Sequence, residues 1–186
     1  MRLKASKRTR RIAAMEGTRG ARLGRLRTLD ALTLGAVALV VLLVSLPRLQ
    51  DLAVRENEGD ARWLTERLAE LTREAPGGVR DIHGLLADQP TLTRLLDDSE
   101  YLEGGRLLRR HGYLFEVVAA PEGSLDCAAA AVRAWPWRYQ RTGREVYLWR
   151  CGEPLRAHPN AGGRWSGPGR PPVLAGDEAG WSSLAR

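Results

Sequence analysis

The sequence contains few of the residues on which most enzymes and metal sites depend. Of its 186 residues only three are histidines and two are cysteines. The histidines are far apart, and no Gly-x-Ser-x-Gly elbow, His-Glu-x-x-His motif or phosphate-binding loop occurs. Two distant cysteines without a neighbouring histidine pair do not fit the ligand spacing of zinc sites. We therefore expect no catalytic site, no metal site and no cofactor, and we expect that the protein is not an enzyme.

Excess positive charge is lacking once the first 27 residues are set aside. The chain carries 29 Lys and Arg against 22 Asp and Glu, a formal net charge of +7. Residues 1–27 hold 10 of the basic residues and a single acid, Glu16, so the rest of the chain is slightly acidic. A strongly basic protein usually suggests nucleic acid or an acidic membrane surface as its partner. Here the net charge belongs to a short N-terminal leader instead.

Charge is absent altogether from residues 31–47. At 1.5 Å per residue this run covers roughly 25 Å, close to the ~30 Å of a membrane hydrocarbon layer. A cleaved secretory signal and a buried core helix are the alternatives, but the run is longer than most signal cores and a core helix needs no basic flank. We predict a membrane-spanning helix over 29–47. The positive-inside rule places the leader, 1–28, in the cytoplasm and everything after Arg48 outside.

For the outer portion the sequence predicts helices first and strands after them. Apolar residues recur every three or four positions over 48–75, which predicts an amphipathic stalk helix that Pro76 and two glycines end. Pro47 is expected to kink the junction with the membrane helix. Short helical pieces follow over 79–110, with Pro90 in a first turn. Strands are expected from His111, over 132–139 with an edge or bulge at Pro136, over 146–149 and around 155–158.

This order of elements predicts an α+β fold with a small antiparallel meander. The extracytoplasmic domain then covers 48–158, and the Pro- and Gly-rich segment 159–186 is expected to be a flexible tail. Cys127 and Cys151 both fall in this outer portion, where an oxidising compartment favours a disulfide between them. Buried free thiols are the alternative.

Aromatic and basic residues alternate in the second and third predicted strands. Such a hairpin could stack bases and hold phosphates, which makes nucleic acid a conceivable partner. Packing in the core or at a sheet edge is the alternative, because strands favour aromatic residues for packing alone. The candidate surface consists of Trp135, Trp137, Arg138, Arg141, Arg144 and Trp149.

Several short motifs make the chain similar to type IV pilins and type II secretion pseudopilins. Thr-Leu-Asp at 28–30 resembles the family's Thr-Leu-x-Glu start, and Pro47 stands seventeen residues after Asp30, as the membrane-helix proline does after the family's glutamate. Asn-Glu-Gly-Asp-Ala at 57–61 is similar to the Asn-Glu-x-x-Ala of some pilin-like proteins. Gly-Tyr-Leu-Phe at 112–115 and Thr-Gly-Arg-Glu-Val-Tyr at 142–147 look like two of their strand motifs.

The resemblance, which covers about residues 24–158, implies a bacterial structural subunit in the inner membrane. Its partners would be sister pilin-like subunits and a prepilin peptidase. In the family the peptidase cuts after a glycine and before phenylalanine or methionine; here Gly24, Arg25 and Leu26 stand at that place. The family's glutamate pairs with a neighbouring subunit's free amine, which implies an assembly role for Asp30. A helix N-cap is the alternative role for that side chain.

Two functions are compatible with these features. The first is a minor pilin or pseudopilin that is processed and assembled. The second is an uncleaved, single-pass anchored binding module that keeps the architecture without polymerising. Cleavage of the leader would separate them.

Overall fold

The computed structural model describes residues 6–75, 81–87, 89–118, 130–174 and 179–184, and side chains only from Asp30 onward. The chain divides into two compact units, residues 1–49 and 50–186. The helix α1, Ser6–Glu74, contributes to both, with Pro47 inside it. The predicted stalk helix is confirmed to within a residue at its end. The predicted domain limits at 28, 47 and 158 stay predictions.

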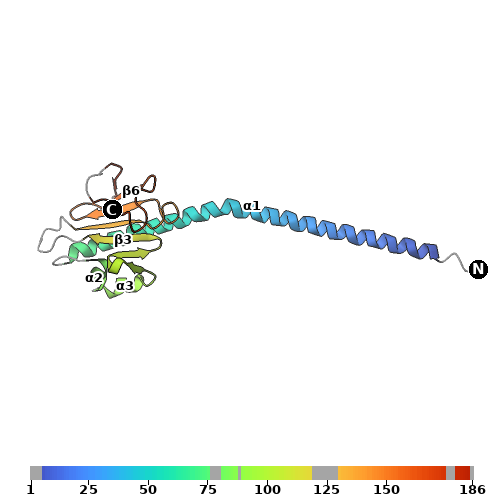
Figure 1. Ribbon diagram of the computed structural model, residues 1–186, viewed down its shortest axis with the longest axis horizontal. Helices are drawn as coiled ribbons and strands as arrows, with labels where there is room; N and C mark the ends of the chain where they lie inside the picture. The colour runs from blue at the N-terminus through green and yellow to red at the C-terminus, as the bar shows by residue number, and fades with distance from the viewer. Residues whose placement is uncertain (1–5, 76–80, 88, 119–129, 175–178, 185–186) are drawn as a thin grey trace, which may run out of the picture. The chain divides into compact units, whose positions relative to one another are not determined.

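The second unit consists of the last part of α1, two short helices and one sheet (Figure 1). The helices are α2, Ile82–Ala87, and α3, Pro90–Leu95, with Pro90 in the first turn as predicted. The strands are β1, Glu100–Leu102; β2, Leu107–Arg110; β3, Tyr113–Val118; β4, Ala131–Pro136; β5, Val146–Arg150; β6, Arg156–His158; and β7, Ser182–Ser183. A 3-10 turn, η1, Glu103–Gly105, joins the first two strands.

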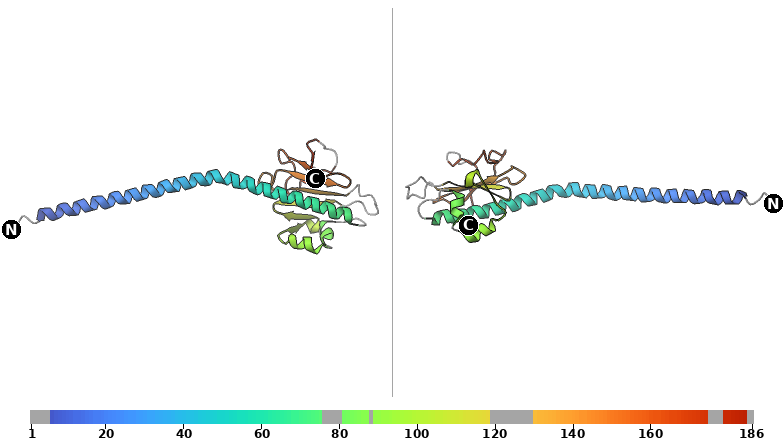
Figure 2. Two further views of the ribbon diagram at one scale, coloured as in Figure 1. Left: turned by 180° about the vertical axis from the view of Figure 1, so that it is seen from behind. Right: turned by 60° about the horizontal axis from the view of Figure 1, so that its bottom comes forward.

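The sheet is an antiparallel meander in which every strand pairs with its neighbour in sequence, in the order β1 to β7. The central pair β3–β4 has the longest register, from Tyr113 opposite Pro136 to Val118 opposite Ala131. The last turns of α1 lie across one face of this sheet (Figure 2). The predicted α+β class is therefore confirmed.

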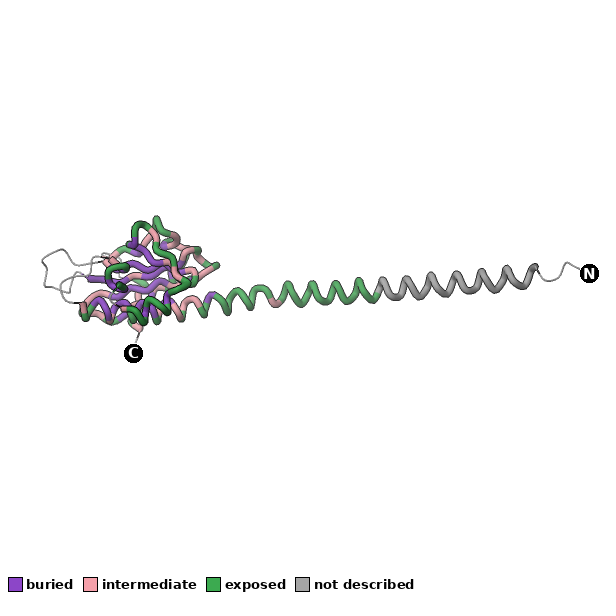
Figure 3. The backbone as a smooth tube through the Cα atoms, turned by 90° about the horizontal axis from the view of Figure 1, so that it is seen from below, coloured by how far each residue is buried: buried purple, intermediate pink, exposed green. Residues whose placement is uncertain are grey.

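Two apolar clusters hold the second unit together, one on each face of the sheet. The main core joins α1 residues such as Leu64 and Leu68 to α2, α3 and sheet residues including Phe115. The smaller core lies on the other face and comprises Leu107, Leu114, Trp135, Val146 and Trp165. Burial is concentrated in the sheet and the helix turns beside it (Figure 3).

The expectation that strands begin only at His111 is wrong, because β1 and β2 precede it. Leu107 and Leu108 are both fully buried, one in each core. A strand that is covered on both faces shows no alternation of apolar and polar residues, so it cannot be told from a short helix by its pattern.

The second predicted strand also needs correction. It ends at Pro136, three residues earlier than expected, and β4 is a central strand with partners on both sides. Pro136 is tolerated there because the pairing with β5 ends at Ala134, so its missing N–H removes no bond to that strand.

The expectation of a flexible tail after His158 is wrong for the described residues 159–174 and 179–184. Asn160 is fully buried and forms two hydrogen bonds with the backbone of Trp165. Its Nδ2 donates to the Trp165 carbonyl, and its Oδ1 accepts from the Trp165 N–H. Trp165 is 3% exposed, and β7 adds the last strand to the sheet. This segment is ordered because it covers the face of the sheet that α1 leaves open.

Candidate functional site

The apolar part of α1 is the first candidate site. Large apolar side chains from Leu32 to Leu49 are more than two-fifths exposed, for example Leu34 at 76% and Leu42 at 55%. α1 is long and apolar enough to cross a membrane, and none of its most apolar stretch is buried within the chain. The buried-core-helix alternative is therefore wrong. A single-pass anchor and a signal segment both match this exposed apolar helix.

Asp30 and Pro47, the predicted assembly residues, both lie inside α1. Asp30 is exposed, and it is no N-cap, because the helix begins at Ser6 rather than after residue 30. The side chains of Gly24, Arg25 and Leu26 lie outside the described part of the chain, so the processing expectation stays a prediction.

A second candidate site lies where α1 meets the turns of the sheet. Asn57 donates from Nδ2 to the Thr142 carbonyl at 3.0 Å. One carboxylate oxygen of Glu58 accepts from the backbone N–H groups of Arg144, at 2.7 Å, and of Glu145, at 3.3 Å. These three bonds join the helix to the β4–β5 turn, more than 80 residues away in sequence.

Two further acids on α1 extend this set of contacts. Asp60 Oδ2 accepts from Arg110 Nε at 3.1 Å and lies 2.9 Å from Nδ1 of His111, both at the β2–β3 turn. Asp51 pairs with the Arg144 guanidinium. We call this group of α1 acids, Asn57 and their turn partners the helix–turn lock.

Close backbone packing completes the helix–turn lock. Gly112 has φ +75°, which favours glycine, and a Cβ there would lie 2.5 Å from Thr142. A Cβ on Gly143 would lie 2.1 Å from the Tyr113 hydroxyl, which donates to the Glu145 carbonyl at 3.0 Å. Burial raises the pKa of Tyr113 and of Tyr147 far above the usual range, so both hydroxyls remain hydrogen-bond donors.

The lock therefore brings together the motifs at 57–61, 112–115 and 142–147, which are distant in sequence. Each of its acids is already paired, and no group of three or more potential metal ligands occurs among the described residues. The arrangement fixes the helix against two turns. Sequence reasoning missed Asp51 and Arg110, whose partners no local spacing could reveal.

The predicted aromatic and basic surface does not exist as one surface. Trp135 is fully buried in the smaller core and Trp149 is 2% exposed in the main core, on opposite faces of the sheet. The guanidinium carbon of Arg109 lies over the Trp137 ring, 5.0 Å from the ring centre. Arg138 and Arg141 are exposed, but Arg144 belongs to the helix–turn lock. Packing was thus the correct alternative for the two buried tryptophans, and they cannot stack on bases.

Only one of the two cysteines, Cys151, lies in the described part of the chain. Cys151 is partly buried beside the main core and is not a free thiol. Cys127 falls in 119–129, outside the described residues. The disulfide between them stays a prediction.

The fold defines a class of architecture. A long N-terminal helix, apolar and exposed at first and then packed on an antiparallel sheet, is the arrangement of pilin-like proteins. Comparison of the chain with family models, curated proteins and solved structures found no match.

Proposed function

We propose that this protein is a membrane-anchored structural subunit of the pilin or pseudopilin type, and not an enzyme. The observation that carries the proposal is the change of environment along α1. Its apolar residues up to Leu49 are exposed, whereas Val54, Ala61, Leu64 and Leu68 are buried in the second unit. An exposed apolar helix needs lipid or another helix as its surroundings.

In this proposal the leader lies on the cytoplasmic side of the inner membrane and the sheet lies outside it. The leader's excess of arginine and lysine supports that orientation. Sister subunits would pack against the same apolar segment after leaving the bilayer. The helix–turn lock would transmit the position of the helix to the sheet, since it joins α1 to two turns through charged and neutral hydrogen bonds.

The experiment is to express the full chain in bacteria with and without a prepilin peptidase and to measure its intact mass after membrane extraction. We expect retention in membranes after alkaline carbonate and peptidase-dependent loss of 24 or 25 residues, which corresponds to cleavage after Gly24 or Arg25. A membrane-bound chain that keeps Met1 would favour the anchored module instead. A soluble chain that has lost the apolar segment would contradict both and identify a signal peptide.

A further inference from the structure

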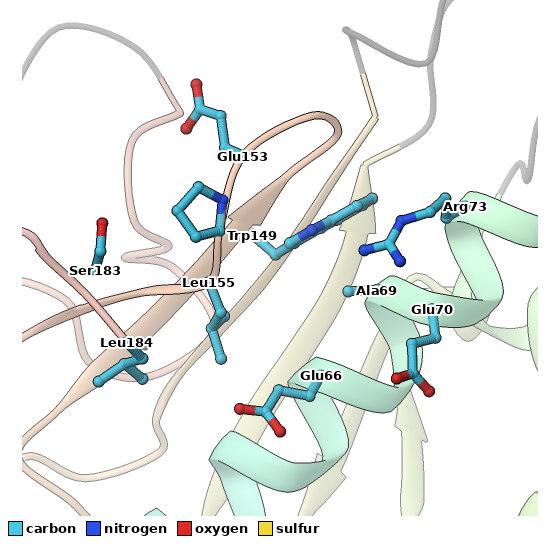
Figure 4. Close-up of a pocket in the computed structure, with 10 residues that line it drawn as sticks. Glu66, Ala69, Glu70, Arg73, Trp149, Glu153, Leu155, Ser183 and Leu184 are labelled. Carbon is cyan, nitrogen blue, oxygen red and sulfur yellow. The ribbon is translucent and has the colours of Figure 1, made fainter. Parts of the chain in front are cut away.

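A pocket of about 290 Å³ lies between the last turns of α1 and the β5–β7 end of the sheet (Figure 4). Its size is near the lower limit, about 300 Å³, of small-molecule sites. The floor is apolar and consists of Ala69, Trp149, Leu155 and Leu184, most of which are buried. An apolar body of about a phenyl ring and a short chain matches a pocket of this size and apolar floor.

Four charged side chains line the rim, and three of them are already neutralised. Glu66 pairs with Arg62 at 3.1 Å, Glu70 with Arg67 at 2.8 Å and Glu153 with Arg156 at 3.2 Å. In each of these ion pairs the arginine is only three or four residues from its glutamate in the sequence. The glutamates therefore offer little net attraction to a cation.

Arg73 is the fourth charged group and differs from the others. Among the described residues it has no carboxylate partner, and its guanidinium lies 5.7 Å from the centre of the Trp149 ring. Figure 4 shows it at one end of the pocket, directed toward the indole. Arg150 also lies 3.9 Å from Glu153, so among the described residues five arginines accompany four glutamates around the pocket when the adjoining Glu74 is counted. The unmatched charge is positive.

We propose that this pocket binds an apolar carboxylate, with the carboxylate on Arg73 and the apolar body on Trp149, Leu155 and Leu184. A guanidinium can bind a carboxylate with two parallel hydrogen bonds, and an adjoining apolar wall strengthens them by excluding water. The same chemistry is offered by a small free acid and by the C-terminus of a peptide that ends in an apolar residue. This site is independent of the role proposed above for the membrane helix.

The test uses the full chain in phosphatidylcholine nanodiscs and ligand-observed NMR titrations. The probes are 3-phenylpropionate, its uncharged amide and 3-phenylpropylamine, together with a peptide ending in Leu-Phe as the free acid or as the amide. We expect the acids to bind about tenfold more tightly than the amides. Arg73→Gln should abolish that difference, whereas Arg55→Gln, an exposed arginine on α1 that does not line the pocket, should keep it.

The comparison of the two acids identifies the source of the ligand. Tighter binding of the peptide acid points to a protein C-terminus, and tighter binding of phenylpropionate points to a small acid; either result supports the proposal. Equal binding of acid and amide, preference for the amine, absence of binding at millimolar concentration, or an unchanged acid preference in Arg73→Gln would each overturn it.

Discussion

At the scale of single residues, several positions within the family-like motifs are constrained by their neighbours in this fold. Gly143 leaves room for the Tyr113 hydroxyl, and Gly112 leaves room for Thr142 at a positive φ. Glu58 supplies the acceptor for two backbone N–H groups of a turn. A buried donor without an acceptor costs about 1–3 kcal/mol, so loss of the Glu58 carboxylate would destabilise the fold by leaving backbone N–H groups unpaired. A larger residue at either glycine would destabilise it by steric overlap.

Gly143→Ala tests the close approach at the helix–turn lock. The added Cβ would overlap the Tyr113 hydroxyl, and we expect the free energy of unfolding to fall by about 1–3 kcal/mol. The matched control is Gly59→Ala on α1, where nothing lies within 4 Å and helix propensity favours alanine by about 1 kcal/mol. Urea unfolding of both variants measures the difference. Equal effects of the two substitutions would show that Gly143 is not constrained by Tyr113.

At the scale of elements, α1 is one helix in two environments. Up to Leu49 its apolar side chains are exposed, and from Val54 onward one side is buried against the sheet. The burial of Leu64 and Leu68 beside α2 and α3 stabilises the second unit, while the earlier apolar residues add nothing to that core. Membrane retention and domain stability should therefore depend on different residues of the same helix.

Two variants separate these roles. Leu39→Arg combined with Leu43→Arg places two charges in the apolar segment, each of which costs about 2.5–3.5 kcal/mol at the centre of a bilayer, so retention after alkaline carbonate should be lost. Leu68→Ala should keep retention but lower the free energy of unfolding by about 2–5 kcal/mol. Carbonate extraction and tryptophan-monitored unfolding are measured on both. Loss of both properties in either variant would contradict the division.

At the scale of the whole molecule, the sheet has a cover on each face. α1, α2 and α3 cover one face, and the segment that contains Trp165 covers the other. This second cover is fixed by Asn160, by donation from Trp135 Nε1 to the Gly167 carbonyl at 2.7 Å, and by donation from Arg133 to the Pro172 carbonyl at 2.6 Å. A chain with both faces covered needs no partner to bury its sheet.

The predicted disulfide also acts on the whole molecule. Cys127→Ser should lower the free energy of unfolding under non-reducing conditions by about 3 kcal/mol, because the bond would close a loop of about 24 residues in the unfolded chain. Thermal unfolding with and without reductant measures this. A reductant effect in the native chain that is absent from the variant is expected, and identical curves for both proteins would refute the bond.

Much of this architecture could be predicted because it depends on local patterns. The uncharged run at 31–47, the 3-4 rhythm that follows it and the aromatic and β-branched residues after Tyr113 are each properties of one element, so α1, β3 and the α+β class could be predicted. β2 could not be, since Leu107 and Leu108 are buried on opposite faces of the sheet and show no period, and β1 is only three residues long. The segment after His158 looked flexible because glycine and proline composition does not reveal what a stretch of chain covers.

The candidate sites, like the fold, could be predicted only in part from the sequence. By itself the sequence determined that the net charge lies in residues 1–27, that an apolar helix follows them, and that the rest of the chain is α+β, because charge, length and period are properties of contiguous residues. Only the tertiary structure decided that Asp51, Asn57, Glu58 and Asp60 meet two distant turns, that Trp135 and Trp149 are buried, and that Arg73 lies over Trp149 beside an apolar pocket. Those facts depend on which residues the sheet brings side by side, and a linear pattern does not contain that information.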